Sequence, residues 1–422
     1  MNRISLVLLS LILLFTAMLS GASPQAAAMK KAPVREAAVK AAAAGKTPVR
    51  KTTARKTKAV QTKTTAKITA PRKATVTRKA PARKTSARKR AAPRRTYSPW
   101  DTPSFADSTW GDVVDGEDLT VRRAAVAALG PYNGTVVVSD PHTGRILTIV
   151  NQKLALSGAY YPCSTIKLVA GLAGLAEGIV DRDTRLRLSA RETMDLTEAL
   201  ARSNNPYFAN IGEKLGFERI TYYSKLFGLG ERAGLNIEGE SPGVFPEEPP
   251  KGWPLGRITS FGTGIGLTAL QLTAIVNSIA NGGTLYWLQY PSNQEEARNL
   301  VPRVKRYLQM QSAIPELTPG MRGATEAGSA RRAFYDANEP IMGKTGTCTD
   351  TRTHLGWFGS FNEVEGRKLT VVVLLTGGRH VSGPVASGIA GQVYKNLSQQ
   401  EYFARDRRLT PSADALSAST LN

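Results

Sequence analysis

The segment 29–96 restricts what this chain can fold into more than any other feature. It holds 23 Lys and Arg residues and a single acid, Glu36, and most of its other residues are Ala, Thr and Pro. Such a composition buries too little apolar surface to offset the entropy that is lost on ordering. We therefore expect residues 29–96 to form a disordered basic arm, and the fold to be built from the residues that follow it.

The charge of this arm determines which partners it can bind. The whole chain has a formal net charge of +23, yet outside the arm 33 basic residues nearly balance 32 acidic ones. One interpretation is a solvated spacer, and the other is an electrostatic contact with an anionic wall polymer or with anionic lipid headgroups. Nucleic acid attracts the same charge, but the N-terminal segment argues against that partner.

Residues 1–28 have the pattern of an export signal. A short basic start, Met1-Asn2-Arg3, precedes a mostly apolar run at 4–22 and the small residues at 26–28. The apolar run is close to the ~20 residues that span a bilayer. The segment is therefore either a cleaved signal peptide or a retained membrane anchor. Both alternatives place the body outside the cytoplasm, in the periplasm or an equivalent extracytoplasmic space.

The body of the chain combines strand and helix patterns. Residues 97–129 are a short polar lead-in, and residues 401–422 are a polar tail. Between them, β-branched runs at 134–140 and 145–151 around a Pro/Gly turn predict a hairpin. The other predicted elements are helices at 164–176, 195–215, 265–280 and 384–397, and strands at 341–348, 355–361 and 369–376. This order indicates an α/β domain with a largely antiparallel five-stranded sheet flanked by helices, plus a helical lobe.

Ser164 and Lys167 form the first candidate catalytic pair. They lie in Tyr161-Pro-Cys-Ser-Thr-Ile-Lys167, and residues three apart share one face of a helix. A serine hydroxyl becomes a good nucleophile only with a base within hydrogen-bond reach. Lys167 can be that base if burial or a cationic neighbour lowers the pKa of its amine toward neutrality. By itself, this spacing also arises by chance on amphipathic helices.

Two further clusters follow in the chain. Ser203-Asn204-Asn205 comes after a helical stretch, and its hydroxyl and amide suit proton transfer and the orientation of a substrate amide. Lys344-Thr345-Gly346-Thr347 lies on a predicted strand. There the lysine and the hydroxyls can bind a carboxylate, and the glycine allows a substrate backbone to approach closely. Either cluster alone is weak evidence, but the ordered set S-x-x-K, S-x-N and K-T-G is specific.

This ordered set resembles the penicillin-binding protein and serine β-lactamase superfamily, and in particular the transpeptidase domain of penicillin-binding proteins. The resemblance includes Asp140-Pro-His-Thr-Gly-Arg-Ile-Leu147, which is similar to the family's opening hairpin, and glycine-rich segments at 227–240 and 262–283. We therefore identify residues 130–400 as a penicillin-binding transpeptidase-like catalytic domain.

The resemblance implies catalytic roles for four residues. Ser164 is the expected acylated nucleophile and Lys167 its base. Ser203 and Asn205 are expected to carry the proton path and to hold the substrate peptide. The implied reaction is serine acyl transfer by a D,D-transpeptidase or D,D-carboxypeptidase, and it needs no metal or other cofactor.

The resemblance also implies a substrate. Lys344, Thr345 and Thr347, beside Gly346, are expected to bind the terminal carboxylate of a D-alanyl-D-alanine stem peptide of peptidoglycan, or that of a β-lactam. The backbone N–H groups of Ser164 and Thr347 are expected to form the oxyanion hole.

The chain has two cysteines, Cys163 and Cys348. An even pair in an exported protein favours a disulfide, and two small buried thiols are the alternative. Cys163 directly precedes the expected nucleophile, and Cys348 directly follows Thr347. Class A β-lactamases with carbapenemase activity are similar, with a disulfide at the same positions relative to their motifs. This resemblance implies a Cys163–Cys348 bond.

Two other functions stay open on the sequence. A serine β-lactamase needs a general base to hydrolyse its acyl-enzyme, and Glu231-Arg-Ala-Gly-Leu-Asn236 comes near the class A E-x-x-L-N loop, with one residue too many. A non-catalytic wall-binding or β-lactam-sensing protein is the second alternative, although the complete motif set argues against it. The chain also departs from many membrane-anchored transpeptidases, which carry a sizeable non-catalytic domain where this chain has its arm and lead-in.

Overall fold

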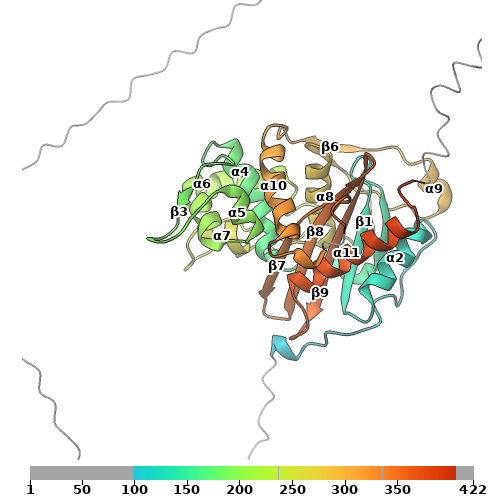
Figure 1. Ribbon diagram of the computed structural model, residues 1–422. Helices are drawn as coiled ribbons and strands as arrows, with labels where there is room; N and C mark the ends of the chain where they lie inside the picture. The colour runs from blue at the N-terminus through green and yellow to red at the C-terminus, as the bar shows by residue number, and fades with distance from the viewer. Residues whose placement is uncertain (1–97, 236, 334–335, 405–422) are drawn as a thin grey trace, which may run out of the picture. The chain divides into compact units, whose positions relative to one another are not determined.

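The computed structural model describes residues 98–404, except 236 and 334–335 (Figure 1). The predicted export signal or anchor at 1–28, the basic arm at 29–96 and the tail beyond residue 404 lie outside the described residues. Within the described part of the chain, no helix has both the length and the hydropathy needed to cross a bilayer.

Five antiparallel strands form the central sheet, in the order β2-β1-β9-β8-β7. Their bounds are Gly134–Ser139 (β1), Ile146–Val150 (β2), Ile341–Thr349 (β7), His354–Val364 (β8) and Arg367–Gly377 (β9). The predicted hairpin, the three late strands and the antiparallel five-stranded sheet are therefore confirmed. β7 is an edge strand of this sheet, and Figure 1 shows the helical lobe beside it.

Side chains of the central strands alternate between two apolar cores. Val136 on β1 and its partner Val373 on β9 pack into one core. Val137 and its partner Val372 pack into the other. Successive side chains of a strand point to opposite faces of the sheet, and here helices cover both faces. This explains why these strands are nearly unbroken runs of apolar residues rather than alternating ones.

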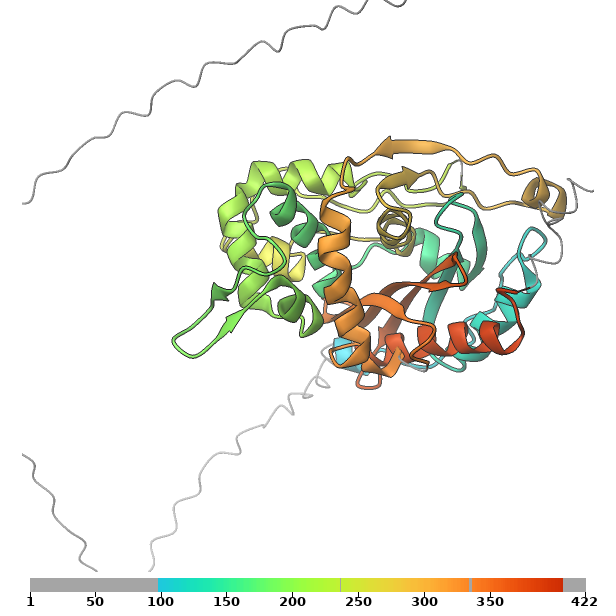
Figure 2. The ribbon, with the colours of Figure 1, turned by 45° about the horizontal axis from the view of Figure 1, so that its top comes forward.

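Helices lie on both faces of the sheet (Figures 1 and 2). α2 (Leu119–Leu129) and α11 (Gly383–Gln399) pack on one face, and α8 (Ala269–Ala280) packs on the other. α11 confirms the predicted terminal helix. α8 is buried on every side and begins later than predicted, at a capping box in which the side chains of Thr268 and Gln271 accept from each other's backbone N–H. The predicted lead-in contributes α2, whose apolar side chains join the second core.

The helical lobe consists of α4 (Lys167–Ala176), α5 (Leu196–Ala201), α6 (Asn205–Leu226) and α7 (Gly256–Phe261), with α10 (Ala313–Glu326) between α5 and β7. The apolar spacing at 195–215 predicted one helical stretch, but the structure divides it into α5 and α6. The spacing is compatible with helix on both sides of the break, so periodicity alone does not reveal it.

The remaining described elements are short. They are η1 (Pro99–Asp101), α3 (Gln152–Ser157), η2 (Cys163–Ile166), β3 (Leu186–Arg187), β4 (Thr193–Met194), β5 (Thr284–Tyr286), α9 (Gln294–Arg298), β6 (Val304–Tyr307) and η3 (Arg331–Ala333).

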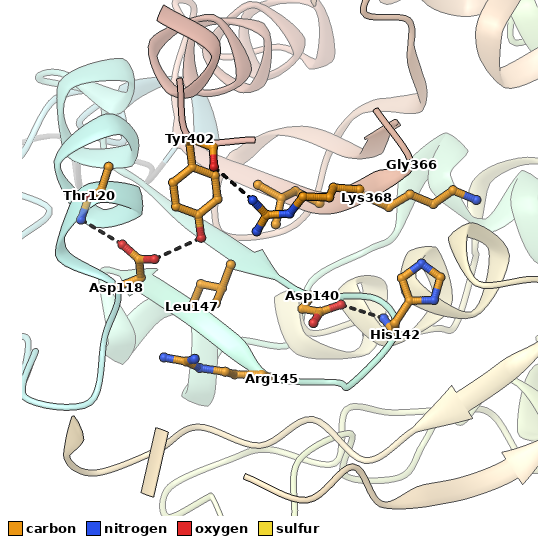
Figure 3. Close-up of a pocket in the computed structure, with 11 residues that line it drawn as sticks. Asp118, Thr120, Asp140, His142, Arg145, Leu147, Gly366, Lys368 and Tyr402 are labelled. Atoms are coloured by element: carbon orange, nitrogen blue, oxygen red, sulfur yellow. Dashed lines mark hydrogen bonds between the residues drawn. The ribbon is translucent and has the colours of Figure 1, made fainter. Parts of the chain in front are cut away.

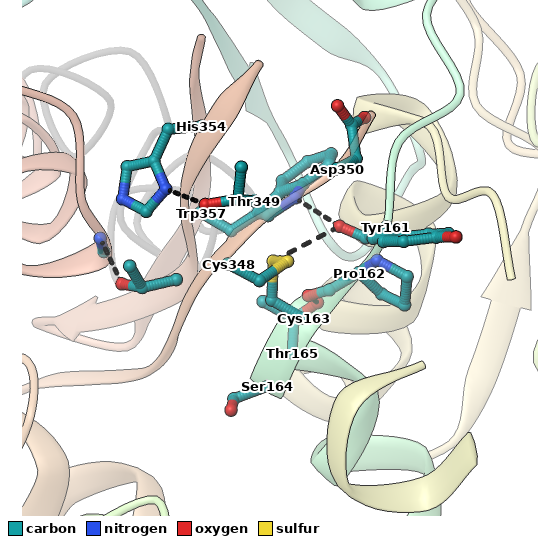
Figure 4. Close-up of a disulfide and its surroundings, with 12 residues drawn as sticks. Tyr161, Pro162, Cys163, Ser164, Thr165, Cys348, Thr349, Asp350, His354 and Trp357 are labelled. Carbon is teal, nitrogen blue, oxygen red and sulfur yellow. Dashed lines mark hydrogen bonds between the residues drawn. A yellow bond between two sulfur atoms is a disulfide. The ribbon is translucent and has the colours of Figure 1, made fainter. Parts of the chain in front are cut away.

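The turn η2 is attached to β7 by a disulfide (Figure 4). Cys163 and Cys348 are bonded, with their Cα atoms 5.6 Å apart and a sequence separation of 185 positions. Trp357 on β8 donates its indole N–H to the carbonyl oxygen of Tyr161 over 2.9 Å. A Cβ at Gly346 would lie only 3.2 Å from the Cβ of Cys163, so glycine allows β7 to approach the turn closely. A covalent bond, a hydrogen bond and close packing together fix η2 against the sheet.

Loss of the disulfide should lower stability. In the chain-entropy model, a bond that closes so long a loop contributes up to ~5 kcal/mol to the free energy of unfolding. We expect the double variant C163A/C348A to lose about 2–5 kcal/mol relative to the oxidised protein. Urea titration followed by tryptophan fluorescence measures the difference, and reduced wild-type protein is the matched control. Peptide maps of the protein purified without reductant that find both thiols free would contradict the bond itself.

Candidate active site

Ser164 lies on the turn that leads into α4. The turn η2 ends at Ile166, and α4 begins at Lys167. Cys163 has a φ of 51°, a left-handed conformation that costs a non-glycine residue on the order of 1 kcal/mol. Across this turn the Ser164 hydroxyl lies 3.1 Å from Nζ of Lys167. The contact expected from the three-residue spacing is present, with a 3-10 turn in place of an α-helix at its start.

The amine of Lys167 is buried and surrounded by oxygen atoms. Its Nζ lies 2.6 Å from Oδ1 of Asn205, 2.7 Å from the carbonyl oxygen of Ser203, and 3.1 Å from the hydroxyls of both Ser164 and Ser203. A neutral amine has two N–H donors and one lone pair. The two shortest contacts are with oxygens that can only accept, so they take both donors and leave the lone pair for a hydroxyl proton. This arrangement suits an amine that receives a proton from Ser164.

Two buried lysines set the electrostatics of the site. Burial lowers the pKa of Lys167 to about 6, and the positive charge of Lys344 adds to this effect. Burial also lowers the pKa of Lys344 to about 7. Within the described chain, neither amine forms an ion pair with a carboxylate. Because two neighbouring buried cations repel each other, a neutral Lys167 beside a charged Lys344 is the favoured state at a pH between these two values.

The break between α5 and α6 brings Ser203 and Asn205 to Lys167. Ser203 has a φ of 58°, which ends α5. The side chain of Asn204 then caps α6 by accepting from the backbone N–H of Tyr207 over 2.9 Å. Asn205 is the first residue of α6. The interruption therefore turns two polar side chains toward the lysine instead of continuing the helix.

Lys344 enters the same cluster from β7. Its buried amine lies 2.8 Å from the Ser203 hydroxyl, which is itself 3.1 Å from Lys167. Ser203 therefore bridges the two amines, and the structure brings the S-x-x-K, S-x-N and K-T-G motifs into one cluster.

Two groups outside the motifs hold the hydroxyls of Thr345 and Thr347. The Thr345 hydroxyl lies 2.7 Å from that of Ser329, which follows α10. The Thr347 hydroxyl accepts from the N–H of Gly383, at the start of α11, over 2.7 Å. Thr347 is exposed, whereas Thr345 is buried. Neither Ser329 nor the N–H of Gly383 was predicted from the sequence. The Ser-Gly-Pro run at 382–384 is a helix-start signal, but no local pattern relates Ser329 to Thr345.

A separate pocket of about 530 Å³ lies near the turns between β1 and β2 and between β8 and β9 (Figure 3). Basic and acidic side chains line it, including Arg145, Lys368 and Asp118, and Asp118 accepts from the hydroxyl of Tyr402 over 2.9 Å. No residue of the three motifs is among those that line this pocket. We therefore take the Lys167 cluster, and not this pocket, as the candidate active site.

Curated proteins similar to this chain include a sporulation protein and a peptidoglycan D,D-transpeptidase. Stage V sporulation protein D of Bacillus subtilis is 27% identical over 318 residues, which cover 64% of this chain and 48% of that protein. Peptidoglycan D,D-transpeptidase MrdA of Haemophilus influenzae is 23% identical over 353 residues, which cover 64% of this chain and 54% of that protein. The chain thus spans about half the length of these relatives.

Solved structures share the fold. Pseudomonas aeruginosa PBP2 in complex with WCK 5153 superposes with a TM-score of 0.56 at 22% identity, covering 68% of this chain and 78% of that one. The D,D-transpeptidase domain of a peptidoglycan glycosyltransferase from Eggerthella lenta has a TM-score of 0.53 at 18% identity, covering 70% and 87%. Residues 134–398 also match the family model described as "Penicillin binding protein transpeptidase domain". This match covers well over half of the 422 residues, and the chain therefore belongs to the penicillin-binding protein transpeptidase family.

Proposed function

We propose that this protein is a serine acyl-transfer enzyme that acts on D-alanyl-D-alanine stem peptides of peptidoglycan, as a D,D-transpeptidase or D,D-carboxypeptidase, and binds penicillin covalently. The observation that carries the proposal is the buried Lys167 amine, which lies 3.1 Å from the hydroxyls of both Ser164 and Ser203. Membership of the family, and a curated relative with the name peptidoglycan D,D-transpeptidase, support the substrate class.

The first half-reaction forms an acyl-enzyme. Oγ of Ser164 attacks the carbonyl carbon of the D-Ala–D-Ala peptide bond, and its proton moves to Nζ of Lys167. The backbone N–H groups of Ser164 and Thr347 stabilise the oxyanion, and losing one such donor typically costs ~3 kcal/mol of barrier. The C–N bond then breaks, and the departing D-alanine amine takes up a proton through the Ser203 hydroxyl. With a β-lactam the same steps open the ring, and the amine stays attached.

The second half-reaction releases Ser164. An amine from another stem peptide, or water, attacks the ester carbonyl, and Lys167 accepts the proton of the incoming group. The Ser164 oxygen leaves and regains a proton, which restores the starting state. An amine acceptor gives a cross-link, and water gives a trimmed stem peptide.

The substrate carboxylate is proposed to bind along β7. Lys344 supplies a positive charge in a buried environment, where an ion pair is stronger than in water. The exposed hydroxyl of Thr347 already accepts a hydrogen bond from Gly383, so its own proton is free to donate to an anion.

The contacts of Glu231 favour a transpeptidase over a β-lactamase. Its carboxylate lies 3.0 Å from Nζ of Lys305 and 2.6 Å from the guanidinium of Arg306, both on β6. Within the described chain, no carboxylate forms a hydrogen bond with Ser164 or Lys167. Without a carboxylate to activate water, we propose that the penicilloyl-enzyme hydrolyses slowly.

The basic arm and the export signal complete the proposal. Residues 1–28 are proposed to direct the body out of the cytoplasm, with residues 4–22 as the anchor if they are retained. The 23 basic residues at 29–96 are proposed to hold the enzyme near an anionic wall polymer or anionic lipid headgroups.

Ser164→Ala should abolish covalent labelling by fluorescent penicillin, because no other group is proposed to form the acyl bond. Turnover of a D-alanyl-D-alanine peptide should fall by ~10³-fold or more. Ser189→Ala, in the exposed turn between β3 and β4, is the matched control and should label like wild type. A label that persists on the S164A protein would overturn the mechanism, and a label that wild type sheds within seconds would point to a β-lactamase.

The acylation rate at low penicillin concentration should depend on pH with two limbs. It should rise as the pH increases through about 6, because Lys167 then loses its proton and can act as a base. It should fall above about 7, as Lys344 in the free enzyme loses its charge and attracts the carboxylate less. Stopped-flow labelling between pH 5 and 9 measures both limbs. With a penicillin methyl ester, which lacks the carboxylate, the limb above pH 7 should disappear. A profile that is flat below pH 7 would refute the role of Lys167.

Deletion of residues 29–96 should remove the salt-sensitive binding of the protein to anionic surfaces without changing penicillin labelling. Co-sedimentation with isolated cell walls and with vesicles that contain an anionic phospholipid separates the two proposed partners. Binding of the full chain should weaken steeply between 50 and 500 mM salt, because exposed charges are screened. Salt-insensitive binding, or equal binding of the deletion variant, would contradict an electrostatic role.

A further inference from the structure

We propose that Ser329 is a positioning residue that prepares Thr345 to bind the substrate carboxylate. Ser329 lies in the turn after α10, outside the three motifs. The inference deepens the proposed function above and rests on it.

Ser329 connects the two sides of the site. Its backbone N–H donates to the carbonyl oxygen of Ala201 over 3.1 Å, at the end of α5 and two residues before Ser203. Its hydroxyl lies 2.7 Å from that of Thr345 on β7. One residue therefore links the segment that carries the S-x-N motif with the strand that carries K-T-G. It is a second connection between these two segments, in addition to the 2.8 Å contact between Lys344 and Ser203.

The backbone around Ser329 is held without help from its side chain. A Cβ at Gly328 would lie 2.3 Å from the carbonyl oxygen of Ala201, so the turn is packed directly against the end of α5. The N–H of Ala330 donates to the carbonyl oxygen of Ala324 over 2.8 Å, which attaches the other side of the turn to α10. Removal of the Ser329 hydroxyl alone should therefore leave the turn in place.

The direction of the hydrogen bonds assigns a role to this hydroxyl. A carboxylate only accepts hydrogen bonds, so Thr345 must donate its single proton to bind one. Its oxygen is then best satisfied by accepting from Ser329, whose hydroxyl has no other hydrogen-bond partner within the described chain. In such a chain, the hydrogen bond from Ser329 to Thr345 polarises the Thr345 hydroxyl, and this strengthens the hydrogen bond from Thr345 to the anion. Thr347 is arranged in the same way. The N–H of Gly383 can only donate, so the Thr347 oxygen accepts from it and the Thr347 proton is left to bind the anion.

The test compares two ligands that differ only in the carboxylate. We expect Ser329→Ala to lower the acylation efficiency for penicillin about three- to tenfold, the effect of one net hydrogen bond, mainly through weaker binding. Acylation by the penicillin methyl ester should change by less than about twofold. Ser329→Thr keeps the hydroxyl and should restore discrimination between acid and ester. Ser278→Ala is the control, because this buried hydroxyl in α8 donates to the carbonyl oxygen of Ile275 in its own helix and has no other partner in the described chain.

The outcomes separate this inference from the proposed function. Equal losses on acid and ester, or no loss on either, would overturn the role of Ser329. Loss of the S329A effect in a Thr345→Ala background would support action through Thr345, and an undiminished effect there would refute it. Wild-type protein that neither ligand acylates would refute the proposed function itself and the role of Ser329 with it.

Discussion

The buried amine of Lys167, which is held among oxygens and pairs with no carboxylate of the described chain, is the constraint on which the rest of the site depends. A lysine in the unfolded chain is charged at neutral pH, whereas this one has a pKa of about 6 in the fold. Keeping it neutral at pH 7 costs on the order of 5 kcal/mol of stability relative to an ordinary lysine. This cost begins as the pH falls below the pKa of the unfolded lysine. It grows until the pH falls below the folded pKa of about 6, where the lysine is protonated in both the folded and the unfolded protein. Hydrophobic burial elsewhere in the two cores must offset it.

Three separate segments bury that amine and orient it. Cys163 has a left-handed backbone conformation that forms the turn before Ser164. Ser203 has the same kind of conformation, which ends α5 so that α6 starts beside the lysine. β7 closes the third side with Lys344. The backbone is strained at Cys163, next to the first motif, and at Ser203, within the second. Such strained conformations persist only where the surrounding structure holds them in place. The disulfide and the close approach at Gly346 hold η2 in this conformation against β7.

How much the sequence predicts depends on how local each contact is. The Ser164–Lys167 contact follows from spacing, because one helical turn has nearly fixed geometry, and the strands follow from runs of apolar and β-branched residues. The contact between Lys344 and Ser203 joins residues 141 positions apart. It depends on how β7 packs beside the lobe, so local patterns cannot predict it, although the family resemblance led us to expect the two motifs in one site. Neither local patterns nor the family resemblance predicted the break between α5 and α6 at Ser203 or the bond between Ser329 and Thr345. A break in a helix is decided by side-chain caps and tertiary contacts rather than by apolar period.

In the proposed mechanism, the charge of the substrate also affects the pKa values of the two lysines. Burial lowers the pKa of both lysines, and the charge of Lys344 lowers that of Lys167 further, so Lys167 loses its proton before Lys344 as the pH rises. A bound carboxylate raises the pKa of Lys344, because an opposite charge nearby favours the charged form. It also screens Lys167 from the repulsion of Lys344, so the pKa of the base rises toward that of an amine able to hold a proton during the reaction. In the proposed mechanism, a carboxylate bound on β7 would therefore do more than anchor the substrate. It would stabilise the charge of Lys344 and raise the pKa of Lys167, the proposed base. The Ser203 hydroxyl contacts both amines and so connects them directly.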